Sequence, residues 1–229
     1  MSSASHFQLI VLSRSYKLID MKNDQLHTSM SRRGALGLSA LLSAWCLSWP
    51  AHARSTPSAA EGPYYPLPSM RFADSDNDLV HVKGRSREAN GEIIWLKGRI
   101  LDRLGKPAAA ARIEIWQTDV NGRYLHTGDP RHQGFDKTFQ GFGQSITDRS
   151  GAYIFRTIKP ASYPGRTPHI HVKIYYGSQT LTTQFYLAGH PANERDFLYR
   201  RLSADQRKSV EMNLIQSPMG IQTKVDIYL

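Results

Sequence analysis

From residue 93 onward, the chain is a series of short β-like runs separated by turn residues, and this pattern limits the fold more than any other sequence feature. The run Arg112–Trp116 alternates polar and apolar residues, which is typical of a strand with one buried face. Only residues 193–202 and 204–215 have a helical pattern. The sequence therefore predicts one all-β domain, a β-sandwich or barrel with long loops and a short C-terminal helical segment. The expected strands are residues 93–101, 112–116, 152–158, 169–176, 181–187 and 223–229.

Composition excludes several other classes of protein. Cys46 is the single cysteine among 229 residues, so a disulfide framework and a thiolate metal cluster are both ruled out. The net charge of +10 comes from Lys and Arg residues that are scattered along the chain and form no run interleaved with aromatic residues. This favours a solvated basic surface, and we predict no nucleic-acid partner. An anionic small substrate would also benefit from the basic balance.

The first fifty residues have the pattern of a targeting signal. Ser31, Arg32 and Arg33 precede an apolar run over residues 34–50, and an Ala-His-Ala sequence ends at Ala53. This combination is typical of an export signal over residues 1–53, and the paired arginines indicate the twin-arginine route. We expect a periplasmic or secreted protein without stable membrane association after cleavage; an uncleaved N-terminal anchor is the alternative. An irregular arm (54–92) and the β domain (93–229) would follow.

His169 and His171 open one of the expected strands. Side chains two residues apart leave the same face of a strand, with their backbones roughly 6–7 Å apart. Two imidazoles in that arrangement can converge on one metal ion, although histidines with this spacing also occur as ordinary polar residues on exposed strands. On this pair alone, the two interpretations are equally good.

Two tyrosines could complete such a site. Tyr163 lies six residues before His169, and Tyr124 lies in a turn after the expected strand 112–116. A phenol has a pKa of about 10, but a bound trivalent cation can displace its proton. Two tyrosinates and two histidines would suit ferric iron better than zinc or copper. With eleven tyrosines in the chain, ordinary packing remains the better interpretation of each tyrosine on the residues alone.

An ordered series of motifs resembles the intradiol aromatic-ring-cleavage dioxygenases, and most of all the iron-bearing subunit of protocatechuate 3,4-dioxygenase. The similarity runs from about Glu61 to the end of the chain and implies the two-sheet β-sandwich of that family. The motifs are Glu-Gly-Pro-Tyr-Tyr-Pro (61–66), Gly-Arg-Tyr (122–124), Phe-Arg-Thr-Ile-Lys-Pro (155–160), Tyr-Pro (163–164) and His-Ile-His (169–171).

The resemblance implies a reaction and roles for individual residues. The reaction inserts both atoms of O2 into a catechol-type diol and cleaves the ring between the two hydroxyl-bearing carbons. Arg166 would stabilise charge on the substrate ring, and Gln184 would shape the pocket on the oxygen side. Tyr163 would leave the iron and take a proton when substrate binds. The implied ligands of a non-haem Fe(III) ion are Tyr124, Tyr163, His169 and His171.

The chain also departs from the family pattern. The protocatechuate branch has a longer, tryptophan-containing loop between Tyr-Pro and His-x-His, whereas only residues 165–168 fill that space here. We therefore expect a more open pocket, and the substrate, of catechol or protocatechuate type, stays undetermined. The helical dimer domain of catechol 1,2-dioxygenases has no counterpart. The sequence is compatible with a homo-oligomer.

Two non-enzymatic interpretations are alternatives to the dioxygenase. One is a non-catalytic subunit on the same sandwich, which would be expected to have lost at least one ligand, although all four are present. The other is a transthyretin-like carrier of small ligands, for which the His-x-His pair and the two tyrosines would be coincidental. A ferric tyrosinate protein is coloured by charge transfer, whereas a metal-free binding module is colourless.

Overall fold

The structure of the protein is a computed structural model that describes residues 55–229. The predicted export signal and its cleavage position after Ala53 lie outside the described residues. Within residues 55–229, no helix has both the length and the apolar character needed to cross a membrane.

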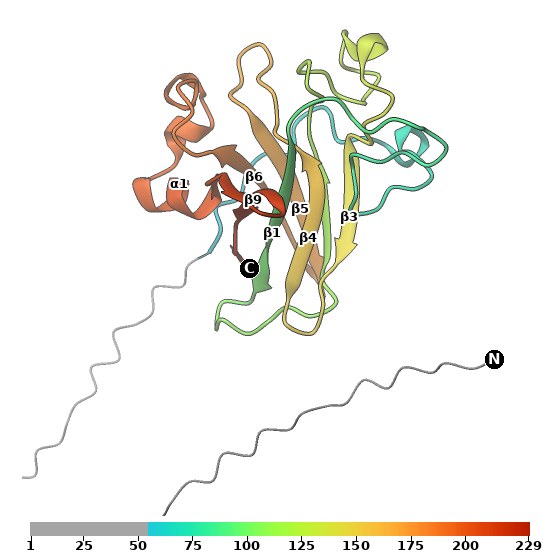
Figure 1. The fold of residues 1–229 in the computed structure, drawn as a ribbon. Helices are drawn as coiled ribbons and strands as arrows, with labels where there is room; N and C mark the ends of the chain where they lie inside the picture. Colours follow the sequence, from blue (N-terminus) through green and yellow to red (C-terminus); the bar gives the residue numbers. More distant parts are fainter. Residues whose placement is uncertain (1–54) are drawn as a thin grey trace, which may run out of the picture. The chain divides into compact units, whose positions relative to one another are not determined.

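Two five-stranded sheets make up the described part of the chain (Figure 1). The first sheet consists of β1 (Ile93–Leu101), β4 (Ala152–Ile158), β8 (Ile215–Ser217), β9 (Gly220–Lys224) and β10 (Ile227–Tyr228). The second consists of β2 (Arg112–Trp116), β3 (Phe142–Ile146), β5 (His169–Tyr176), β6 (Gln179–Leu187) and β7 (Glu211–Met212). Strand β1 pairs antiparallel with β4 and parallel with β9 and β10, and the second sheet has the order β3-β2-β5-β6-β7.

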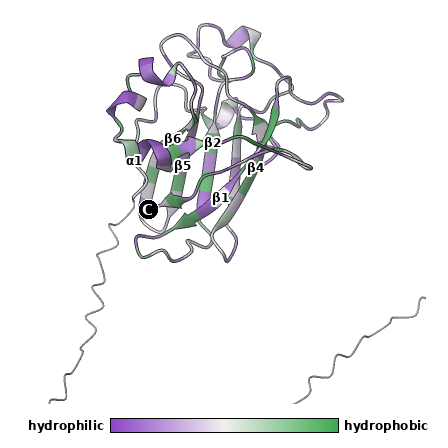
Figure 2. Cartoon of the chain, turned by 60° about the vertical axis from the view of Figure 1, so that its left-hand side comes forward, coloured by the Kyte–Doolittle hydropathy of each residue, from purple (hydrophilic) through white to green (hydrophobic). Residues whose placement is uncertain are grey.

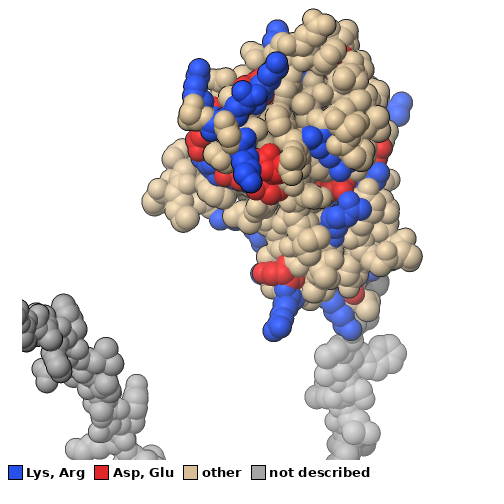
Figure 3. All heavy atoms as spheres, turned by 90° about the vertical axis from the view of Figure 1, so that its right-hand side faces the viewer, with Lys and Arg blue, Asp and Glu red and all other residues tan. Residues whose placement is uncertain are grey.

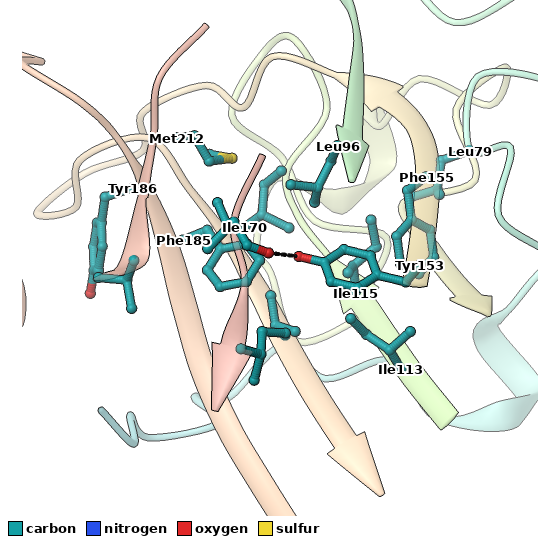
Figure 4. Packing of buried hydrophobic residues seen from close by; sticks show 14 of the residues in the cluster. Leu79, Leu96, Ile113, Ile115, Tyr153, Phe155, Ile170, Phe185, Tyr186 and Met212 are labelled. Carbon is teal, nitrogen blue, oxygen red and sulfur yellow. Dashed lines mark hydrogen bonds between the residues drawn. The ribbon is translucent and has the colours of Figure 1, made fainter. Parts of the chain in front are cut away.

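Alternate residues of the strands fill the space between the two sheets. Ile113 and Ile115 of β2, Phe155 of β4 and Ile170 of β5 are fully buried, and Figure 4 shows their side chains directed into one interior. The hydroxyl of Tyr153 reaches into the same region and donates to the Val225 carbonyl at 2.7 Å, which satisfies its only donor group. Hydrophobic segments accordingly lie along the strands, as Figure 2 shows. The predicted all-β two-sheet sandwich is confirmed.

Strand β5 presents its other residues away from this interior. Ile170, Val172 and Ile174 belong to the core, so the pleat directs His169 and His171 to the opposite face, which we call the outer face of the second sheet. Both histidines are nevertheless buried. The segment that precedes β1 provides much of their cover.

Residues 55–92 run along the sandwich with one 3-10 turn, η1 (Pro68–Met70). Backbone hydrogen bonds attach this arm to β6 (Ala59 N–H to Thr182 O, 2.8 Å) and to β4 (Leu79 N–H to Arg156 O, 2.8 Å). The ring of Tyr65 packs edge-on against Trp116, with 4.9 Å between ring centroids. The arm therefore covers the outer face where the histidines lie.

The helix expected over residues 193–202 is wrong. Two 3-10 turns occur there instead, η3 (Asn193–Arg195) and η4 (Tyr199–Arg201). The Asp196 carboxylate accepts hydrogen bonds from the backbone N–H groups of Leu198 and Tyr199 at 2.9 and 3.0 Å. A side-chain oxygen that binds these donors competes with the hydrogen bonds of a continuous helix.

Other boundaries differ from the expected ones near the C-terminus. Helix α1 (Ala204–Val210) begins with a capping box formed by Ser203 and Gln206, but it ends at Val210 because the chain continues as β7 beside β6. The closing strand expected at 223–229 is divided between β9 and β10. Strand β3 has no counterpart among the predicted strands, since Gly143, Gln144 and Ser145 break the hydrophobic alternation. A further 3-10 turn, η2 (His132–Gly134), lies in the loop before β3.

The surface charges follow the scattered pattern of the sequence. On the face shown in Figure 3, Lys and Arg side chains lie at several separate places from top to bottom, with Asp and Glu among them. Ion pairs also form between partly exposed groups of the described residues, such as Arg156 with Glu88 and Lys224 with Asp226.

Replacing Phe155 by alanine tests the position of the core. Phe155 is fully buried, so Phe155→Ala should lower the free energy of unfolding by about 3–5 kcal/mol. The neighbouring residue Ile154 points to the other face and is 41% exposed, so Ile154→Ala should cost less than about 1 kcal/mol. Urea denaturation of both variants measures the difference, and equal losses would contradict the proposed core.

Candidate metal centre

The strand register brings the two histidines of β5 together. His169 lies opposite Tyr186 of β6, and His171 lies between Trp116 of β2 and Gln184 of β6. The Nε2 atoms of the two imidazoles are 3.1 Å apart. Their exposed fractions are only 2% and 3%, so both rings are removed from bulk water.

Tyr124 completes a group of three close donor atoms. Its hydroxyl oxygen lies 3.3 Å from Nε2 of His169 and 3.0 Å from Nε2 of His171. Two buried carboxylates shape the loop that carries it. Asp119 accepts hydrogen bonds from the backbone N–H groups of Asn121 and Arg123, both at 2.9 Å. Asp129 accepts from the N–H of Tyr124 itself at 2.9 Å.

Tyr163 and Arg166 occupy the two ends of a tight turn. The N–H of Arg166 donates to the carbonyl of Tyr163 at 2.9 Å. Pro164 and Gly165, with Gly165 at φ +83°, fit the middle positions of a type II turn. The turn places the Tyr163 ring 5.4 Å from the ring of Tyr124 and 5.6 Å from that of His169, measured between centroids. The structure thus brings all four expected ligands into one cluster.

Arg166 and Gln184, the other two predicted site residues, contact each other. The Arg166 Nη2 group donates to Oε1 of Gln184 at 2.6 Å, and its Nε group donates to Asp196 at 2.8 Å. The same Gln184 oxygen accepts from the Tyr186 hydroxyl at 3.0 Å. The Gln184 amide donates to the Ala60 carbonyl at 3.2 Å, which links the site to the arm.

Hydrogen bonding fixes the tautomer of His169. Its Nδ1 atom lies 2.7 Å from the carbonyl oxygen of Thr167, and a carbonyl can only accept. Nδ1 therefore carries the hydrogen, and the lone pair of Nε2 faces His171 and Tyr124. Nδ1 of His171 has no hydrogen-bond partner among the described residues, and its ring stacks on Trp116 at 4.7 Å and 8°.

The environment keeps both imidazoles neutral. Burial lowers the pKa of His169 to about 3, with a further contribution from the positive charge of Arg166. Burial also lowers the pKa of His171, as do His169 and Arg166. For Tyr124, burial raises the pKa, and so does the neighbouring phenol of Tyr163. Without a cation, these groups therefore prefer their uncharged forms.

The donor atoms fit a single metal ion. Donors about 2.0–2.1 Å from a common ion, at angles of 90–110°, lie about 2.8–3.4 Å from one another. The three donor–donor separations in the structure, 3.0, 3.1 and 3.3 Å, fall in that range. Within residues 55–229 no group of three His, Cys, Asp or Glu side chains could hold a metal, and the oxygen donor beside the two imidazoles is the Tyr124 hydroxyl. Imidazole nitrogen with phenolate oxygen suits a hard, highly charged cation such as Fe(III).

Three residues of the site are absent from the predicted set. Tyr64 lies 4.8 Å from Tyr124 between ring centroids, and its only sequence signal is the motif at 61–66. Trp116 ends a predicted strand, but its stacking on His171 depends on strand pairing. Asp196 lies 30 residues beyond Arg166, and no local pattern marks it.

Known proteins resemble this chain in both sequence and fold. A family model described as Dioxygenase matches residues 60–223. The protocatechuate 3,4-dioxygenase beta chain of Burkholderia cepacia is 38% identical over 135 residues, covering 55% of this chain and 57% of that protein. Catechol 1,2-dioxygenase of Acinetobacter baylyi is 33% identical over 167 residues, covering 63% and 50%. The dioxygenase domain of a carbohydrate-binding fusion protein from Streptomyces sp. SirexAA-E superposes with a TM-score of 0.59 at 31% identity, covering 76% of this chain and 97% of that domain.

The chain therefore belongs to the intradiol dioxygenase family. The resemblance seen in the motifs is confirmed at the level of the family. The chain spans 57% and 50% of the length of these two curated relatives.

Acid should destabilise the metal-free protein through the buried imidazoles. A histidine has a pKa of 6.5 when unperturbed, whereas His169 in the fold has a pKa of about 3. Between these values the unfolded chain binds a proton that the folded chain does not, so the free energy of unfolding falls as the pH falls.

Urea denaturation from about pH 7 to about pH 5, above the range where carboxyl groups titrate, measures this effect. His169→Asn should give a shallower dependence, whereas the exposed His81 supplies a matched control, His81→Asn, with the wild-type slope. An unchanged slope in His169→Asn would show that His169 is not the group responsible.

Proposed function

We propose that the protein is a non-haem Fe(III) intradiol dioxygenase that cleaves a catechol-type ring between its two hydroxyl-bearing carbons with both atoms of O2. The observation that carries this proposal is the convergence of the Tyr124 hydroxyl with the Nε2 atoms of His169 and His171, beside the ring of Tyr163. Membership in the intradiol dioxygenase family supports the reaction class.

The four residues of this cluster would hold the iron. Tyr124, His169 and His171 lie at or below 3% exposure and come from a strand and a tightly bonded loop, which suits permanent ligands. When bound, ferric iron supplies a Lewis acid for the two substrate oxygens and an acceptor for electron density from the diol. Two neutral imidazoles and two phenolates would leave a net charge of +1, which favours a dianionic diol as ligand.

Tyr163 would receive a proton from the substrate. It lies on a short turn and is less buried than Tyr124, so its side chain has more freedom to move. Burial raises the pKa of Tyr163, while the charge of Arg166 lowers it. A phenolate released beside a substrate hydroxyl would take that proton at its oxygen, which is general base catalysis.

Arg166 and Gln184 would act on the substrate side of the cluster. The guanidinium is a fixed positive charge that is anchored at Nε and Nη2, and its side chain is 10% exposed. A preorganised charge stabilises negative charge as it develops on the ring, without any proton transfer. Phe197 lies against the same guanidinium at 5.5 Å and is 55% exposed, so it provides an apolar edge where an aromatic ring can approach.

The substrate is a catechol-type diol whose further substituents are set by the rim of the site. The relatives include enzymes named for protocatechuate, catechol and hydroxyquinol. The Tyr163–Arg166 turn on this side of the cluster is only four residues long, and Pro164 and Gly165 at its tip are exposed. Oxygen uptake with a panel of carboxylated and uncarboxylated catechols would define the preference.

Replacing Tyr163 by phenylalanine tests the reaction. The wild-type protein, isolated with one iron per chain, should absorb visible light and consume O2 with at least one catechol. Tyr163→Phe should retain iron, because three ligands remain, but should lower kcat by about 100-fold through loss of the base.

Tyr228→Phe, which alters a phenol at the C-terminal strand, is the matched control and should keep the wild-type rate. Metal analysis, visible absorption and oxygen uptake measure these outcomes. Full iron loading with no uptake for any catechol would refute the enzyme, and an unchanged kcat in Tyr163→Phe would refute the role of Tyr163 as base.

A further inference from the structure

Asp196 has a fully buried carboxylate that accepts four hydrogen bonds, two at each oxygen. Oδ2 accepts from Nε of Arg166 at 2.8 Å and from the backbone N–H of Thr167 at 3.0 Å. Oδ1 accepts from the N–H groups of Leu198 and Tyr199 at 2.9 and 3.0 Å. The side chain of Asp196 has no exposed surface. It thus joins the Tyr163–Arg166 turn to the segment between η3 and η4.

This carboxylate and Gln184 together determine the plane of the Arg166 guanidinium. Asp196 binds Nε, and Gln184 accepts from Nη2 at 2.6 Å. Two contacts at different corners of a planar group prevent it from rotating about its long side chain. Gln184 is held in turn by the Tyr186 hydroxyl and the Ala60 carbonyl.

Asp196 also compensates the charge of Arg166. A guanidinium that is 10% exposed loses much of its hydration, and this cost is tolerable only beside an anion. Among the described residues, Asp196 is the one carboxylate within ion-pair distance of Arg166. Its Oδ2 also accepts from the backbone N–H of Thr167, which fixes the carboxylate itself beside the Tyr163–Arg166 turn.

We propose that Asp196 is a positioning residue for the dioxygenase reaction: it holds the Arg166 guanidinium where charge develops on the substrate ring, without touching the substrate itself. This inference rests on the proposed function. It predicts that Asp196 matters for turnover through Arg166 and not through the general stability of the sandwich.

A double-mutant cycle distinguishes an effect of Asp196 through Arg166 from an effect through the general stability of the sandwich. Asp196→Asn preserves size but removes the charge and turns an amide NH2 group toward donors, so kcat should fall by about 10-fold or more. Arg166→Ala should lower kcat by about 100-fold. Adding Asp196→Asn to Arg166→Ala should then change kcat by less than about twofold, because the group that Asp196 positions is already gone.

The proposal would be overturned if Asp196→Asn lowered kcat by the same factor in the wild type and in Arg166→Ala. Asp196→Ser provides a second variant if the asparagine variant fails to fold, since its hydroxyl brings no clashing NH2 group; the same dependence on background is expected. Asp226→Asn is the matched control, because Asp226 also accepts a backbone N–H and pairs with a cation, Lys224, at the edge of the first sheet. It should keep the wild-type kcat.

An iron-independent measurement distinguishes failure of this inference from failure of the proposed function. Phenylglyoxal modifies accessible guanidinium groups, and mass spectrometry of the peptide containing Arg166 reports its modification in metal-free protein. Arg166 should react at least about fivefold faster in Asp196→Asn than in the wild type or in Asp226→Asn, because its Nε anchor is lost. Unchanged protection would refute the anchoring even in an active enzyme. Faster modification of Arg166 in Asp196→Asn, together with no O2 consumption by the iron-loaded wild-type protein, would uphold the anchoring and refute the proposed function instead.

Discussion

The Tyr124 oxygen lies close to the Nε2 atoms of His169 and His171 in a buried site. The surrounding chain provides the burial and the positioning that this contact requires. Three donor atoms within 3.3 Å of one another require neutral imidazoles, and removal from water supplies that condition. The pleat of β5 alone would leave the histidines on an outer face open to water. The arm and the stacked ring of Trp116 close that face, so residues well before the first strand belong to the site.

Buried carboxylates organise the loops that the sheets cannot position. Asp119 and Asp129 each accept backbone N–H groups around Tyr124, and Asp196 does the same beyond η3 while it binds Arg166. Each of the three takes donors that a loop would otherwise bury without a partner. Burial alone would raise the pKa of Asp129, but hydrogen bonds from backbone N–H groups and from Arg131 hold it below its ordinary value. The pKa of Asp196 is likewise lowered, against the effect of burial, by hydrogen bonds from backbone N–H groups and from Arg166. The sandwich thus supplies the rigid support, and local polar contacts aim the functional side chains.

Local patterns in the sequence predicted much of the fold and part of the site. The β-like runs predicted at 93–101 and 169–176 coincide with β1 and β5, because strand-forming residues bounded by turn signals can be recognised locally. The His-x-His spacing indicated a shared face because side chains two residues apart leave the same face of a strand. Whether the tyrosines join that face depends on loops, and only the family motifs pointed to them. The failed helix at 193–202 and the unanticipated role of Asp196 have one cause, since that carboxylate binds partners 30 residues away as well as nearby N–H groups. The export signal at residues 1–53 stays a prediction.

The position of the metal is the most direct test of this account. Crystals of the iron-loaded protein, measured with anomalous scattering at the iron absorption edge, should show one strong peak in contact with Tyr124, Tyr163, His169 and His171 together. A peak at any other place, or an iron ion that touches the histidines while both phenols point away, would contradict the proposed centre and the chemistry built on it.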